Sequence, residues 1–123
     1  MSIKVSIDAS GGDFGFPVTI SAGINALISF SDLHINLVGD EKGIKEELEK
    51  KSIHKSFLDR IEITHASEVI NMKDSPSTAL RHKKDSSMRV AINLVQSGIS
   101  DACVSAGNTG ALMSIARFVL KTI

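Results

Sequence analysis

The feature that most constrains the fold is the alternation of strand-like and helix-like segments along the chain. Apolar residues at positions 3, 5 and 7 alternate with polar ones, and apolar residues at helical spacing follow from Val18 to Phe30. The same order recurs, with strands predicted at 33–38, 60–64 and 101–105 and helices at 41–51, 78–97 and 111–120. This alternation predicts right-handed βαβ units and a mostly parallel sheet that is covered on both faces.

Composition narrows the class of protein. The chain has 123 residues, 42% of them hydrophobic, which suits one small domain with one core. Its 14 basic residues balance 14 acidic ones, which argues against a dedicated nucleic-acid binder. A single cysteine, Cys103, with four scattered histidines indicates neither an internal disulfide nor a zinc site. With no apolar stretch long enough to span a membrane, we expect a soluble protein of a reducing compartment.

The first candidate site is a glycine-rich loop directly after the first strand. In open α/β sheets, ligands bind beyond the carboxyl ends of the strands. The loop contains Gly11 and Gly12, whose backbone N–H groups can approach a ligand closely, between the carboxylates of Asp8 and Asp13. These carboxylates can orient donors or hold a cation. The alternative is a tight connection capped by aspartates, because paired glycines mark any turn.

A second loop, from Ser105 to Gly110, joins the last strand to the last helix. A helix N-terminus exposes unpaired N–H groups and the positive end of the helix dipole, which favour an anion. The side chains of Ser105, Asn108 and Thr109 add donors to it. The loop matches neither the Walker A pattern nor Gly-x-Gly-x-x-Gly. The alternative is that Asn108 or Thr109 is simply the N-cap of the helix.

The third feature is a basic segment with four fixed cations, Arg81, Lys83, Lys84 and Arg89. At continuous helical spacing, Arg81, Asp85 and Arg89 share a face as two ion pairs, which leaves both lysines less compensated. Lysine suits phosphate as a point charge, and arginine as a bidentate clamp. The alternative is an ordinary solvated helix face, with the helix restarting near Ser86 and Ser87.

Three segments carry a family resemblance: Asp8–Asp13 (DASGGD), Arg81–Val90 (RHKKDSSMRV) and Asp101–Met113 (DACVSAGNTGALM). Together they resemble the phosphate acyltransferase family of bacterial phospholipid synthesis, over essentially all of the chain. Two departures stand out. Ser10 replaces the usual methionine, and Phe16 separates Gly15 from a proline that normally follows directly.

The resemblance implies a three-layer α/β/α sandwich with a mostly parallel sheet, similar to isocitrate and isopropylmalate dehydrogenases. Because family members are considerably longer, we expect residues 1–123 to be the N-terminal portion of a single domain, present only in part. We also expect the chain alone to have little activity.

The resemblance also implies an activity. The family transfers a fatty acyl group from acyl carrier protein to inorganic phosphate, without a cofactor or metal. It further implies a homodimer in the cytoplasm, peripheral to the inner membrane face. A membrane glycerol-3-phosphate acyltransferase uses the acyl phosphate in the next step, and no nucleic acid is involved.

This chemistry fits the candidate residues. Phosphate is already an anionic nucleophile, so the site must hold it against the thioester carbonyl and stabilise the oxyanion. We predict Lys84, Asn108 and Asp13 as the catalytic residues. Phosphate and oxyanion binding is assigned to Gly11, Gly12, Ser105, Gly107, Thr109 and Arg89.

Two other classes stay open from the residues alone. One is a nucleotide- or NAD-binding α/β domain, which the missing Gly-x-Gly-x-x-Gly disfavours. The other is an inactive fragment that acts only as a binding module.

Overall fold

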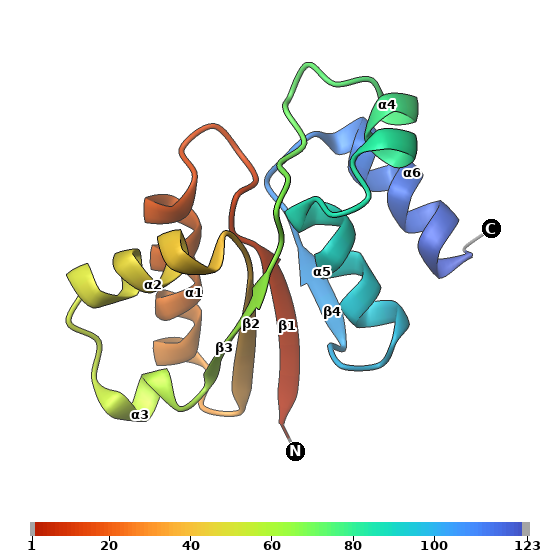
Figure 1. The fold of residues 1–123 in the computed structure, drawn as a ribbon. Helices are drawn as coiled ribbons and strands as arrows, with labels where there is room; N and C mark the ends of the chain where they lie inside the picture. The colour runs from red at the N-terminus through yellow and green to blue at the C-terminus, as the bar shows by residue number, and fades with distance from the viewer. Residues whose placement is uncertain (1, 122–123) are drawn as a thin grey trace.

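A computed structural model describes residues 2–121. Its four strands, β1 to β4, form one sheet in the order β3-β2-β1-β4, and every neighbouring pair is parallel (Figure 1). In chain order the elements are β1 (Ile3–Asp8), α1 (Phe16–Ser29), β2 (Leu33–Gly39), α2 (Glu41–Lys50), α3 (Lys55–Leu58), β3 (Ile61–His65), α4 (Pro76–His82), α5 (Ser87–Gln96), β4 (Ala102–Val104) and α6 (Thr109–Leu120). The predicted α/β alternation and parallel sheet are therefore confirmed.

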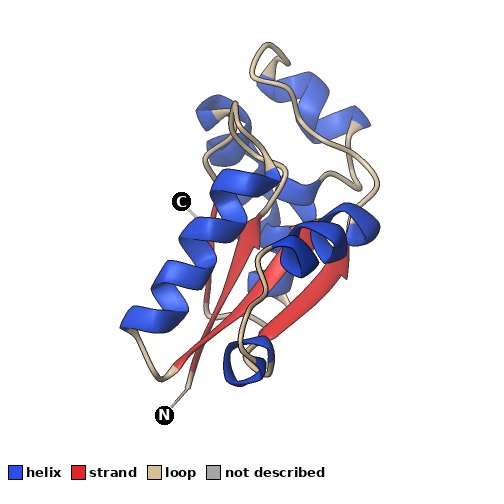
Figure 2. Ribbon diagram, turned by 90° about the vertical axis from the view of Figure 1, so that its left-hand side faces the viewer, coloured by secondary structure: helices blue, strands red, loops and turns tan. Residues whose placement is uncertain are grey.

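Helices cover the sheet from two sides. Helices α1 and α2 pack on one face, and α5 packs on the other against β1, β2 and β4. Seen from the side of α1 and α2, these helices lie in front of the strands (Figure 2). Helices α4 and α6 contact each other, and α6 also contacts α5. The described residues thus form the layers of an α/β/α arrangement.

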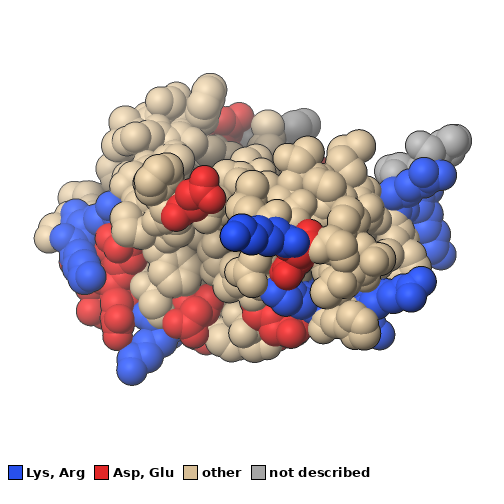
Figure 3. Space-filling model, turned by 90° about the horizontal axis from the view of Figure 1, so that it is seen from above, with Lys and Arg blue, Asp and Glu red and all other residues tan. Residues whose placement is uncertain are grey.

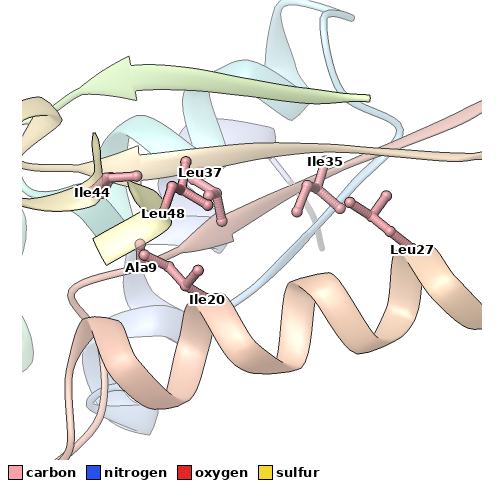
Figure 4. Packing of buried hydrophobic residues seen from close by; sticks show 7 residues of the cluster. All are labelled: Ala9, Ile20, Leu27, Ile35, Leu37, Ile44 and Leu48. Carbon is pink, nitrogen blue, oxygen red and sulfur yellow. The ribbon is translucent and has the colours of Figure 1, made fainter. Parts of the chain in front are cut away.

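The largest core cluster lies between α1, α2 and the sheet. Ile35 and Leu37 of β2 point toward α1, where they meet Ile20 and Leu27 (Figure 4). These four side chains are at most 1% exposed. Because successive strand residues face opposite sides, Val38 lies instead with Ala91 of α5 on the other face. Strand β2 therefore contributes to the core on each face of the sheet.

The predicted helix 78–97 is two helices, interrupted where the sequence suggested. Helix α4 ends at His82, and α5 begins at Ser87 with Ser86 as its N-cap, whose hydroxyl accepts from the Arg89 N–H at 3.0 Å. The expected ion pairs of Asp85 with Arg81 and Arg89 are wrong, because Asp85 lies outside both helices. Its carboxylate accepts from the N–H and hydroxyl of Ser67.

Candidate functional site

Two glycine-containing loops meet at the carboxyl edge of the sheet. One follows β1 and the other follows β4, which are neighbouring parallel strands. A Cβ built on Gly12 would lie 3.3 Å from the Cβ of Ala106, so the two backbones are in close contact. Gly12 also has a φ of 87°, which favours glycine. The sequence placed both loops at this edge, and the structure brings them together.

The Asp8 carboxylate joins these loops. Ser105 Oγ donates to Asp8 Oδ2 at 2.7 Å and accepts from the Gly107 N–H at 3.1 Å. Asp8 is 2% exposed, and its Oδ1 has no hydrogen-bond partner among the described residues. A Cβ on Gly11 would lie 2.6 Å from Asp8 Oδ2, so this position requires the absence of a side chain. The sequence suggested Asp8 only as a flanking carboxylate, but in the structure its side chain connects the two loops.

Asn108 is the N-cap of α6, as the alternative interpretation predicted. Its Oδ1 accepts from the Ala111 N–H at 3.1 Å, and its Nδ2 donates to the backbone carbonyls of Asn71, Met72 and Asp74. The amide hydrogens of Asn108 and the hydroxyl hydrogen of Ser105 therefore have protein partners in this structure. Neither side chain offers a ligand the donor that the sequence suggested.

Other predicted donors lack a protein partner. Thr109 and Gly110 begin α6, where backbone N–H groups have no acceptor within the helix. The Thr109 side chain is exposed, and it makes no hydrogen bond to another described residue. Lys84 is also exposed, between α4 and α5, and forms no ion pair within residues 2–121. Because α5 leads into β4, this connection lies at the same edge of the sheet as the two glycine loops.

The cations of the basic segment have different surroundings in the fold. Lys83 is paired with Asp74 at 2.6 Å and also donates to the Val69 carbonyl, so its charge is compensated, contrary to expectation. Arg89 stacks over the Phe118 ring at 5.4 Å. Its guanidinium also donates to the Leu80 carbonyl of α4 at 3.4 Å, and its buried Nε has no hydrogen-bond partner among the described residues. Figure 3 looks down on this edge and shows basic and acidic side chains interspersed.

Two hollows adjoin the loops. A cavity of about 230 Å³ is lined by the first loop, including Asp13, together with Val18, Thr19 and Ala106. An apolar groove of about 550 Å³ shares the last three residues and runs along α1 and β1 to Phe30. Val104, at its β4 side, is 57% exposed. The described residues thus leave an apolar part of the sheet uncovered beside the candidate site.

The ionisable groups near the site differ in their surroundings. Burial, and secondarily the charge of Asp8, raises the pKa of the Cys103 thiol, which fits a small apolar side chain and not a nucleophile. Hydrogen bonds from Lys83 and the Asn71 backbone lower the pKa of Asp74. Among the described residues, no group of His, Cys, Asp and Glu is arranged to hold a metal, and no helix could cross a membrane.

Comparison with known proteins places the chain in a family. The family model described as "Fatty acid synthesis protein" matches residues 3–123. The chain belongs to this family.

Curated relatives agree with this placement in the fatty acid synthesis protein family. Proteins named "Phosphate acyltransferase" from Ruthia magnifica, Vesicomyosocius okutanii and Hydrogenovibrio crunogenus are 64%, 63% and 52% identical over all 123 residues. The chain spans 36% of the length of each. The family match covers all three candidate segments, including both loops that meet at Asp8 and Ser105.

Proposed function

We propose that this chain forms part of an acyltransferase site that moves a fatty acyl group from acyl carrier protein to inorganic phosphate. The observation that carries the proposal is its identity of up to 64%, over the whole chain, with proteins named phosphate acyltransferase. The loops at the carboxyl edge of the sheet support it, because they gather backbone and side-chain donors where α/β folds bind anions.

The reaction needs no covalent enzyme intermediate. A phosphate oxygen attacks the thioester carbonyl carbon, and a tetrahedral oxyanion forms. The carbon–sulfur bond then breaks, the thiolate of the carrier protein leaves and takes up a proton, and acyl phosphate remains. The protein must orient phosphate and stabilise the oxyanion, which are tasks for fixed donors and positive charge.

The geometry divides these tasks among the predicted residues. Thr109, the first N–H groups of α6, the Gly11–Gly12 backbone and Lys84 are proposed to contact phosphate or the oxyanion. Asn108 is proposed to position α6 through its cap, and Asp13 to orient a donor at the cavity beside Gly12. Arg89 is proposed to add positive charge to the site, because it forms no ion pair within the described residues and its buried Nε has no partner there.

The partners follow from the same proposal. Acyl carrier protein and phosphate are the substrates, and a membrane glycerol-3-phosphate acyltransferase uses the product. We further propose that the complete protein is a cytoplasmic homodimer, peripheral to the inner membrane face, and needs neither cofactor nor metal.

A chimera tests the function. This chain is joined to the rest of the Ruthia magnifica relative, and phosphate-dependent release of free carrier protein from acyl carrier protein is measured. Lys84→Ala should slow release about 100-fold, as loss of an oxyanion donor does. Lys42→Ala, which removes an exposed lysine of α2, is the matched control. If the two variants retain equal activity, the assignment of Lys84 is wrong.

A further inference from the structure

The hydrogen-bonding capacity of Ser105 is nearly used up. A serine hydroxyl has one hydrogen to donate and two lone pairs to accept with. The hydrogen is donated to Asp8 Oδ2, and one lone pair accepts the Gly107 N–H. A single lone pair is left. Ser105 Oγ lies beside Gly11, where a Cβ would be 3.1 Å away, so toward a ligand at this backbone Ser105 can act only as an acceptor.

Asp8 determines that the Ser105 hydroxyl acts as the donor in this hydrogen bond. The contact has the Ser105 hydroxyl as the donor and Asp8 Oδ2 as the acceptor. If the hydroxyl turned away, Asp8 would keep two buried oxygens without a partner, because Oδ1 already has none. Leaving a buried polar group without its hydrogen bond is costly. The Ser105 hydrogen is therefore held away from any ligand.

We propose that Ser105 is a specificity-determining residue that accepts a hydrogen bond from the hydroxyl of bound phosphate, and that Asp8 is its positioning residue. At neutral pH, inorganic phosphate keeps at least one P–OH group, whereas sulfate has none. A fixed acceptor therefore binds phosphate and opposes sulfate, which has similar size and shape. This inference rests on the proposed function, which places phosphate at this loop.

The test is equilibrium binding of inorganic phosphate and of sulfate to the full 123-residue chain at neutral pH. The unmodified chain should prefer phosphate. Ser105→Ala should lower phosphate affinity about tenfold or more, the usual effect of one hydrogen bond to a charged group, and should not lower sulfate affinity. Ser105→Thr keeps the hydroxyl and should keep the preference.

Two further variants separate selectivity from general binding and folding. Thr109→Val removes a donor and should weaken both anions equally. In Asp8→Ala the Ser105 hydrogen is free to turn toward the anion, so sulfate affinity should rise relative to phosphate affinity. Loss of structure alone would not cause this change in the ratio. Circular dichroism checks that each variant folds. If Asp8→Ala does not fold, the phosphate and sulfate affinities of Ser105→Ala and Ser105→Thr test the inference without it.

The outcomes distinguish this inference from the proposed function. A chimera that forms acyl phosphate while Ser105→Ala keeps its preference for phosphate refutes the inference alone. A Ser105-dependent preference in a chimera that transfers no acyl group refutes the function alone. Absence of phosphate binding in both chain and chimera, or equal binding of the two anions by the unmodified chain, overturns the inference.

Discussion

The hydroxyl of Ser105 donates a 2.7 Å hydrogen bond to the buried carboxylate of Asp8, 97 positions earlier in the chain. The bond connects the end of β1 to the loop after β4, and the N–H of Gly107 extends it by donating to Ser105. The two loops that the sequence marked as separate candidates are therefore one hydrogen-bonded unit.

Mutation of this pair should affect stability in a coupled way. Ser105→Ala leaves a buried carboxylate without its partner and should lower the free energy of unfolding by about 1.5–3 kcal/mol. The double variant Asp8→Ala, Ser105→Ala should cost less than the sum of the two single variants, measured by urea unfolding. Additivity within a few tenths of a kcal/mol would show that the two side chains do not act together.

Gly11→Ala should disturb the same unit through steric contact. The new Cβ would lie 2.6 Å from Asp8 Oδ2, so the carboxylate must move away from Ser105. We expect faster hydrogen exchange at the Gly107 N–H. Gly98→Ala is the control, since φ is 82° there but the space is open, and it should cost about 1 kcal/mol without changing Gly107. Equal exchange in both variants would contradict the contact.

Asn108 has two separable structural roles. Asn108→Asp keeps an acceptor for the Ala111 N–H but loses the amide donors that hold Asn71, Met72 and Asp74. It should keep α6 capped while the 71–74 backbone exchanges its N–H groups faster. Asn108→Ala should lose both functions. Its stability in thermal unfolding should be lower than that of Asn108→Asp by about 0.5–2 kcal/mol. If the two variants have the same stability, the cap contributes nothing.

Acid should release the segment that precedes α4. The pKa of Asp74 is lowered by its bonds to Lys83 and the Asn71 backbone, and that of Asp85 by the hydroxyl and N–H of Ser67. Because these folded pKa values lie below the unfolded ones, the bonds stabilise fully above the usual aspartate pKa of about 3.9 and are lost as pH falls through the folded values.

Carboxyl NMR titration of the two aspartates checks this. Ser67→Ala should raise the pKa of Asp85 toward its ordinary value and leave that of Asp74 in place. An unchanged Asp85 titration in that variant would show that Ser67 is not the cause.

Local patterns predicted most of the fold because they depend on neighbouring residues. The spacing of apolar residues determines which face of an element is buried, and the Asp-Ser-Ser sequence at 85–87 correctly suggested a new helix start. The ion pairs of Asp85 were mistaken because they assumed one continuous helix. Four-residue helix α3 was not predicted, since so short a helix has little periodic signal.

The site was less predictable because its contacts are distant in sequence. Asp8 gains its importance from Ser105, and Lys83 is compensated by Asp74 in a segment without a clear pattern. The contacts of Arg89 with Phe118 and with the Leu80 carbonyl likewise join residues from different helices. A charge count shows which cations exist, but only tertiary structure shows which of them remain unpaired.

The most direct test of the account is the phosphate-dependent release of free carrier protein from acyl carrier protein by the chimera. Acyl phosphate should accumulate in equal amount with the released carrier protein, and release should stop when phosphate is omitted. Release that proceeds at the same rate without phosphate, or that yields free fatty acid in place of acyl phosphate, would contradict the proposed acyl transfer.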